Sequence, residues 1–198
     1  MSKLKIMSYS LGLEIEQGVD GIFVSQMKYV IEMLKKFNLD KCKSMAVPFV
    51  VNEKLNKDDG TEPADIALYR CLVGSLIYLT TCKPDLMYSA RLLYRFMHSP
   101  CQLYFVVDKR VLRYLKDIVE FGLWFQRGKT VKLEGYVDSD WVGSVDDSKS
   151  TSFNAFFLGS SPFSWNSRKA EVVAQSIIEA EYTSTVGIAN QSIWLRKL

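Results

Sequence analysis

Two aspartates stand close together in residues 135–141, whose sequence is GYVDSDW. Asp138 ends an apolar stretch typical of a buried strand, and Asp140 follows two residues later. Since side chains two apart on a strand leave the same face, both carboxylates can meet one divalent ion there. A buried carboxylate costs free energy unless a metal or a donor satisfies it. The spacing also fits turn-forming aspartates at a strand end, and spacing alone favours that structural role.

A second acidic pair, Glu179 and Glu181, opens a predicted helix in the segment IIEAEY at residues 177–182. Residues two apart on a helix are separated by about 200° of rotation, so only one of them can face a shared site. The other acid is then favoured by the helix dipole, and that role fits either residue. One strand carboxylate and one helix carboxylate are the minimum of a metal-dependent nuclease, although unrelated proteins also contain such a pair.

Three basic residues, Lys109, Arg113 and Lys116, follow one side of a predicted helix. Such a row can contact the phosphate backbone of a nucleic acid. A merely solvated basic face is the more common arrangement, and both interpretations stay open.

Several classes of site are excluded by what the sequence lacks. It has no Gly-rich phosphate loop and no nucleophile elbow. Its four cysteines form no CxxC pair and His98 is the only histidine, which excludes a Cys/His zinc site. The net charge of +3 permits a nucleic-acid partner without arguing for one. We expect an intracellular protein, cytoplasmic or nuclear, that does not enter a membrane, since no signal-peptide-like or membrane-length apolar segment is seen.

The elements predicted from periodicity give an α+β fold class. A hairpin at 9–16 and 22–24 comes first, and Ser25 is the expected N-cap of a helix to Phe37. A loop at 38–63 is a candidate hinge. Helical periodicity then predicts helices at 64–80, 84–100 and 103–119. Strand patterns follow at 133–137, 152–158, 162–165 and 171–174, before a closing helix at 177–194.

Taken in order, segments along nearly the whole chain resemble the copia family of LTR retrotransposon Pol polyproteins. The matching segments include SYSLGLEI, LYRCLVGSLIYLT, KPDLMYSARLLYRFMHSP, GYVDSDWVGSVDDSKSTS, LGSSPFSWNSRK and EAEY. The resemblance implies the C-terminal part of a reverse transcriptase joined to the N-terminal part of a ribonuclease H.

The resemblance also implies a division into three regions. Residues 1–62 would hold the primer-grip hairpin, with Leu11 and Gly12, and the start of the thumb. Residues 63–122 would form a helical thumb or connection region that holds the primer and template. Residues 131–198 would be a truncated ribonuclease H-like βββα unit.

In that family the first-strand aspartate and the first-helix glutamate are Mg²⁺ ligands of the nuclease, and they match Asp138 and Glu181. Asp140, Trp141 and Gly143 belong to the family signature and are expected to be structural. The family's polymerase motif lies upstream and its other two nuclease acids lie downstream, so the resemblance predicts an incomplete Mg²⁺ site and a chain inactive by itself. The alternative is a non-catalytic module that binds RNA–DNA hybrid or DNA, with Lys109, Arg113 and Lys116 as contacts. The oligomeric state is left open by the sequence.

Overall fold

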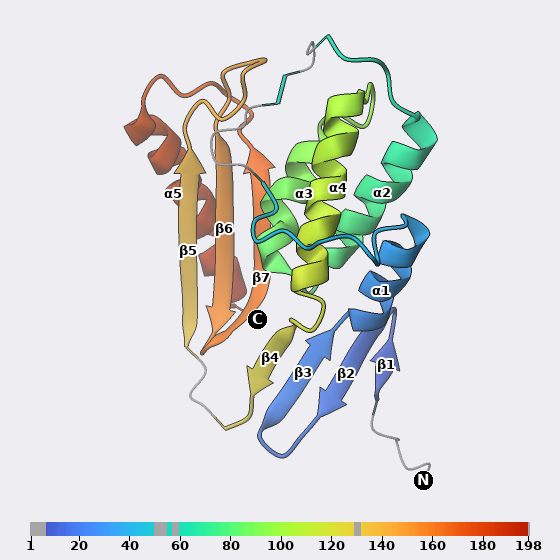
Figure 1. Ribbon diagram of the computed structural model, residues 1–198. Helices are drawn as coiled ribbons and strands as arrows, with labels where there is room; N and C mark the ends of the chain where they lie inside the picture. Colours follow the sequence, from blue (N-terminus) through green and yellow to red (C-terminus); the bar gives the residue numbers. More distant parts are fainter. Residues whose placement is uncertain (1–6, 50–54, 57–59, 129–131, 198) are drawn as a thin grey trace.

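The computed structural model describes residues 7–49, 55–56, 60–128 and 132–197. Within these ranges the chain forms a four-stranded antiparallel sheet, a helical bundle above it and a three-stranded antiparallel sheet beside the bundle (Figure 1). The last helix covers the face of the second sheet that lies away from the bundle. The predicted α+β class is confirmed.

The first sheet has the strand order β1 (Tyr9–Ser10), β2 (Leu13–Gln17), β3 (Gly21–Ser25) and β4 (Leu123–Gln126). The prediction of one strand over 9–16 was wrong, because Leu11 and Gly12 both have positive φ and form a two-residue hairpin turn. Strand β4 was not predicted at all. Strand β4 follows the helices of the bundle in the sequence, whereas its partner β3 precedes them. The pairing therefore joins both ends of this part of the chain into one unit.

Four α-helices form the bundle: α1 (Met27–Lys36), α2 (Ile66–Leu79), α3 (Met87–Tyr94) and α4 (Gln102–Asp117). A short 3₁₀ turn, η1 (Pro84–Leu86), precedes α3 with Pro84 at its first position. The four helices share one core, which therefore runs across residue 62 from one predicted region into the next. Its fully buried members include Val30, Tyr69, Leu72, Leu76, Leu93, Tyr104, Val111 and Leu115.

Two boundary predictions in this bundle were wrong. Ser25 is the last residue of β3, and Gln26 occupies the N-cap of α1 without a side-chain hydrogen bond. The helix predicted over 84–100 is α-helical only in α3, because it starts as a 3₁₀ turn and continues as turns from Arg95 onward.

The predicted loop after α1 contains no helix or strand over residues 38–49, and part of it, at 50–54 and 57–59, lies outside the described residues. Its first part is fastened to α4, since the Met45 N–H donates to the Arg113 carbonyl at 3.2 Å. This segment therefore packs along the bundle.

The second sheet has the order β5 (Leu133–Asp140), β6 (Thr151–Leu158) and β7 (Ser161–Lys169), and α5 (Ile177–Leu195) follows it. The strand predicted at 171–174 is absent from the structure, which has bends and irregular backbone there. The Ala174 carbonyl accepts a hydrogen bond from Trp141 Nε1 at 3.1 Å, so this segment is held by a side chain and not by a ladder.

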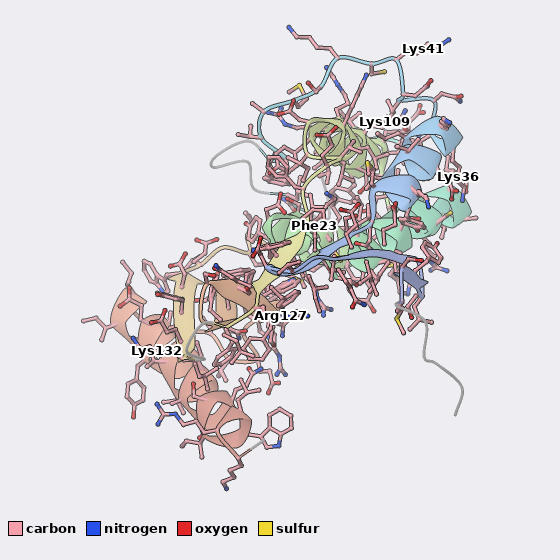
Figure 2. All side chains as sticks on the ribbon, turned by 90° about the horizontal axis from the view of Figure 1, so that it is seen from below. Phe23, Lys36, Lys41, Lys109, Arg127 and Lys132 are labelled. Carbon is pink, nitrogen blue, oxygen red and sulfur yellow. The ribbon has the colours of Figure 1, made fainter. Side chains whose placement is uncertain are left out.

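Side chains of β6 and β7 join this sheet to the bundle. Trp165 Nε1 donates to the Thr80 carbonyl at 2.8 Å, and an Arg95 guanidinium nitrogen lies 3.0 Å from Thr151 Oγ1. Viewed from below, α5 lies at the opposite end of the molecule from α1 and α4 (Figure 2). No helix within the described ranges is long and apolar enough to cross a membrane.

Candidate metal site on strand β5 and helix α5

The two faces of β5 carry different chemistry. Val137 lines a cavity beneath α5, and a Cβ built on Gly135 would lie 3.4 Å from Ile188 Cδ1. The odd-numbered residues of β5 therefore face α5. Because side chains alternate along a strand, Asp138 and Asp140 leave β5 on the opposite face.

Asp140 takes part in the packing between the sheet and the bundle. A Cβ on Gly143 would lie 2.3 Å from Asp140 Oδ2, so glycine lets the backbone come close to this carboxylate as it is placed here. Burial lowers the pKa of the Arg95 guanidinium, and the nearby Tyr88, Asp147 and Asp140 oppose that shift. The structural role expected for Asp140 and Gly143 agrees with these contacts, as does the hydrogen bond made by Trp141.

A neighbouring ion pair fixes the turn after β5. Lys169 Nζ lies 2.7 Å from Asp147 Oδ1. Partial burial acts to raise the pKa of Asp147, but hydrogen bonds from Lys169 and Ser144 outweigh it and lower the pKa to about 2. The loop between β5 and β6 is thus held by charge to the end of β7.

Asp138 itself is exposed near the end of β5. Its Oδ1 accepts the backbone N–H of Ser139 at 2.9 Å, and it stands opposite Phe153 in the ladder. The side chain is accessible to a cation on the face turned away from α5.

The two glutamates at the start of α5 make different contacts. Ser176 Oγ accepts the Glu179 N–H at 3.2 Å, and Glu179 Oε2 accepts the Gln175 N–H at 2.8 Å. This reciprocal pair resembles a capping box and satisfies donors at the helix start. Glu179 is thus occupied in the cap, and Glu181 is left exposed in the same turn.

Helix α5 runs antiparallel to β5, which sets where Glu181 lies. Ile188 packs over Gly135, and Ser184 Oγ lies 2.9 Å from Ser152 Oγ, whose ladder partner is Ser139. One turn earlier, Glu181 lies near the C-terminal end of β5. The structure therefore brings Asp138 and Glu181 to the same end of the strand–helix pair, but it directs Asp138 away from the face that α5 covers.

The acids present do not by themselves build a magnesium site. In the part of the chain that the structure describes, no three His, Cys, Asp or Glu side chains gather closely enough to hold a metal ion. Mg²⁺ requires near-octahedral oxygen ligands, and two carboxylates on different faces do not provide them.

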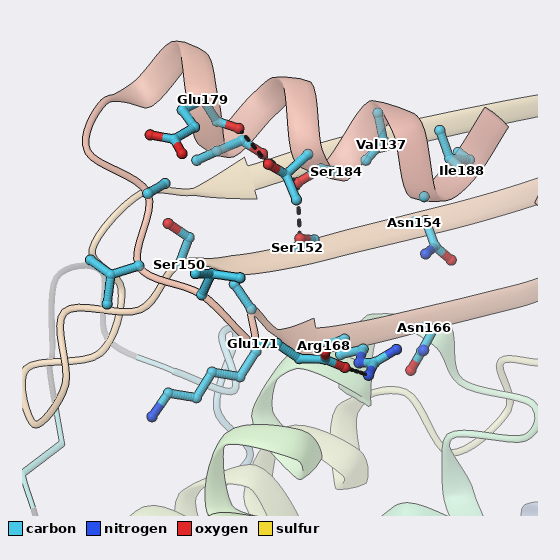
Figure 3. A pocket seen from close by; sticks show the side chains of 18 of the residues that line it. Val137, Ser150, Ser152, Asn154, Asn166, Arg168, Glu171, Glu179, Ser184 and Ile188 are labelled. Atoms are coloured by element: carbon cyan, nitrogen blue, oxygen red, sulfur yellow. Dashed lines mark hydrogen bonds and ion pairs between the residues drawn. The ribbon is translucent and has the colours of Figure 1, made fainter. Parts of the chain in front are cut away.

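A cavity of about 470 Å³ lies between α5, β6, β7 and the segment 170–174 (Figure 3). Its floor is a polar patch from two strands, with Ser152, Asn154 and Asn166. Asn154 Oδ1 is buried there without a hydrogen-bond partner among the described residues. Neither Asp138 nor Glu181 lines this cavity, so it is separate from the candidate acids.

The predicted basic row is present on α4, but two of its members hold the chain itself. Arg113 Nε donates to the Lys43 carbonyl at 2.8 Å, and Lys116 Nζ donates to the Cys42 carbonyl at 2.5 Å. Lys109 is exposed, with its ammonium 4.7 Å from the centre of the Phe105 ring. Arg113 and Lys116 therefore pin the segment after α1 to α4.

Comparison with known proteins shows which proteins this chain is related to. No family model matches the chain, and no solved structure does. The Pol polyprotein from transposon RE2 of Arabidopsis thaliana, which is retrovirus-related, is 37% identical over 96% of this chain. An uncharacterised mitochondrial protein of the same plant is 33% identical over 98% of this chain and 80% of its own length. A secreted effector protein (RxLR 161) of Plasmopara viticola is 39% identical over 64% of this chain and 90% of its own.

The chain belongs to the copia-type retrotransposon Pol family. It spans only about 13% of the RE2 polyprotein, a small part of that protein's length. The family relationship thus covers nearly all of this copia-type chain but only a small part of a whole Pol protein.

Two buried charged residues of this copia-type chain were missed by sequence reasoning. Lys83 is 1% exposed, and its Nζ donates to the carbonyls of Ile118 and Phe121 at 2.6 and 2.9 Å. Burial lowers the pKa of Lys83. Asp108 is fully buried within α4. The sequence did indicate that Asp108 is buried, because Asp108 stands four residues from both Tyr104 and Leu112 and so lies on the apolar stripe of the helix.

Proposed function

We propose that this chain is the stretch of a retrotransposon Pol protein where the end of a reverse transcriptase meets the start of a ribonuclease H, and that the stretch alone neither copies nor cleaves nucleic acid. The observation that carries the proposal is the β5–β6–β7–α5 unit, with Asp138 in its first strand and Glu181 at the start of its helix. This antiparallel strand–strand–strand–helix order supports the ribonuclease H relationship.

The proposed inactivity rests on the geometry of the acids. A two-metal nuclease must hold both ions between converging carboxylates so that the attacking and leaving oxygens are stabilised together. Here Glu179 is occupied by the helix cap, Asp140 by the turn at Gly143, and Asp138 leaves β5 away from α5. Asp138 and Glu181 then remain as two candidate metal ligands, and further ligands would have to complete the metal site.

An extension experiment tests the nuclease relationship. The stretch that follows the matched region in the RE2 polyprotein is joined to the end of this chain, and cleavage of a labelled RNA–DNA hybrid is measured with Mg²⁺. We expect the fusion to cleave the hybrid, and Asp138→Asn or Glu181→Gln to abolish cleavage.

Glu171→Gln is the matched control, since Glu171 is an exposed acid close to α5 that pairs with Arg168. It should leave cleavage unchanged. A folded fusion that shows no cleavage, or cleavage that survives both site substitutions, contradicts the proposal.

A second candidate function is nucleic-acid binding without catalysis, with the RNA–DNA hybrid or DNA held along α4. It is favoured by the exposed Lys109 beside Arg113 and Lys116 on one side of that helix. Each phosphate contact should add about one unit to the negative slope of log affinity against log salt. Binding that Lys109→Ala weakens while reducing this slope supports the candidate, and no binding at low salt removes it.

A further inference from the structure

Helix α5 carries an apolar stripe on the side that faces away from its own sheet. Its inner side is formed by Ala180, Ser184 and Ile188, which contact the sheet. The outer stripe consists of Ile178, Tyr182, Val186, Ala189 and Ile193. These residues recur every three or four positions, so they lie in one row along the helix.

The stripe is open to solvent. Ile178 is 78% exposed, Tyr182 71% and Ile193 57%. Large aliphatic and aromatic side chains gathered in this way on one helix face mark an interaction site, since scattered single residues would form no row. Helix α5 lies at the end of the molecule opposite α1 and α4, where another molecule can approach (Figure 2).

The order of side chains along the stripe is matched to its own reversed copy. When two α5 helices lie antiparallel with their centres together, Ile178 faces Ile193 of the second copy. Tyr182 then faces the small Ala189, which leaves room for the ring. Val186 faces Thr185, whose hydroxyl already donates to the Glu181 carbonyl at 2.8 Å and so brings no unsatisfied donor into the contact.

The charges of α5 favour the same antiparallel direction. Acidic residues lie only in its first turns, at Glu179 and Glu181, and residues 182–195 carry no charge. Basic residues follow at the other end, at Arg196 and Lys197. An antiparallel pair brings each acidic end close to a basic end, whereas a parallel pair would place acid beside acid.

We propose that a second copy of this chain docks on the outer stripe of α5, with the two helices antiparallel about a two-fold axis near Val186. The interface is isologous, because the same stripe serves both copies. A helix of 19 residues gives a seam about 28 Å long, enough for a closely packed helix pair.

Sedimentation equilibrium of the full chain tests the dimer. The average mass should rise from 22.6 kDa toward twice that value over roughly 1 to 100 µM protein. Tyr182→Glu should raise the dimer dissociation constant about tenfold or more, because it places a charge within the apolar seam, against Ala189.

The control is Val106→Glu, which puts the same charge on an exposed valine of α4 and should not change the dissociation constant. Circular dichroism checks that each variant stays folded, and Ala189→Arg serves as a second stripe variant should Tyr182→Glu fail to fold. A chain that remains monomeric at 100 µM, or a dimer that both stripe variants leave intact, overturns the proposal.

Charge reversal at low salt tests the antiparallel direction. Glu181→Lys and Arg196→Glu should each weaken the dimer, and the chain carrying both changes should dimerise more tightly than either single variant. In a parallel pair residue 181 of one copy would lie beside residue 181 of the other, so Glu181→Lys would only exchange an acidic repulsion for a basic one, and Arg196→Glu could not offset it. Simple addition of the two effects therefore overturns the antiparallel arrangement.

Discussion

At the scale of single residues, the most costly feature of the bundle is Asp108. It is fully buried in the middle of α4, and neither carboxylate oxygen has a hydrogen-bond partner among the described residues. Burial raises its pKa well above the ordinary value of an aspartate. Burial also raises the pKa of the neighbouring Tyr69 phenol, and Asp108 adds to that shift. The bundle therefore holds a desolvated acid whose protonated form burial favours.

We expect Asp108→Ala to stabilise the protein by about 1–3 kcal/mol at pH 7, since it removes an unsatisfied buried carboxyl and introduces a better helix former. Because the folded-state pKa is raised, the folded chain binds the proton more tightly than the unfolded chain. The stability of the wild type should then fall as pH rises above about 4, where the unfolded aspartate loses its proton.

Urea unfolding of both proteins at pH 5 and pH 8 measures this difference. The advantage of Asp108→Ala should be larger at pH 8. Asp117→Ala, at the exposed end of the same helix, is the control and should show no comparable pH-dependent gain. A loss of stability in Asp108→Ala would contradict the account.

At the scale of elements, the hairpin turn between β1 and β2 is tied to helix α2. Tyr78 Oη donates to the Leu11 carbonyl, and a Cβ on Gly12 would lie 2.0 Å from Tyr78 Oη. Gly12 also has a φ of +80°, a conformation that favours glycine. The β1–β2 turn is thus positioned by a contact to α2.

Gly12→Ala should destabilise the protein by about 2 kcal/mol or more, because backbone strain is added to a clash with Tyr78. Gly128→Ala is a matched control, since Gly128 has a φ of +79° but, apart from its chain neighbours, no atom of the described residues lies within 4 Å of a Cβ built on it. Chemical denaturation of the two variants separates strain from clash. Equal losses in both would show that the Tyr78 contact does not position the turn.

Elements with a long, regular pattern could be predicted from the sequence, and elements that depend on distant partners could not. The helices around Leu72 and Val111 repeat apolar residues at helical spacing, so their existence follows from local sequence. Strand β4 has four residues and forms only because β3 offers its edge. Val172 and Val173 favour a strand by composition, yet no strand within the described part of the chain pairs with them.

The candidate site shows the same limit. The motif order could be matched to a family, and that resemblance favoured Glu181 over Glu179, a choice that spacing alone left open. The role of Glu179 in the helix cap appeared only with its bonds to Gln175 and Ser176. That Asp138 and Asp140 leave β5 away from α5 depends on the register of the strand and the docking of the helix, which local sequence does not encode.

At the scale of the whole molecule, burial is unevenly distributed. The continuous core of the described residues lies between Val30 and Ile118, within α1–α4 and their connections. The β5–α5 unit contributes fewer buried apolar side chains, among them Ala155, Phe156, Ala180 and Ile188. Less apolar area is therefore removed from water in the second half of the chain.

Hydrogen exchange followed by mass spectrometry should reveal this difference. We expect amides of α2 and α4 to exchange with the highest protection, and those of β5, β6 and α5 to exchange through a lower-energy opening. Uniform protection across both parts would contradict the account and show that contacts such as Trp165 to Thr80 make the whole chain one cooperative unit.

Cleavage of an RNA–DNA hybrid by the unextended chain in Mg²⁺ tests the central claim most directly. We predict that the wild type releases no more product than Asp138→Asn or Glu181→Gln, because the two acids do not assemble a metal site by themselves. Mg²⁺-dependent cleavage by the wild type that disappears in either variant would contradict the claim.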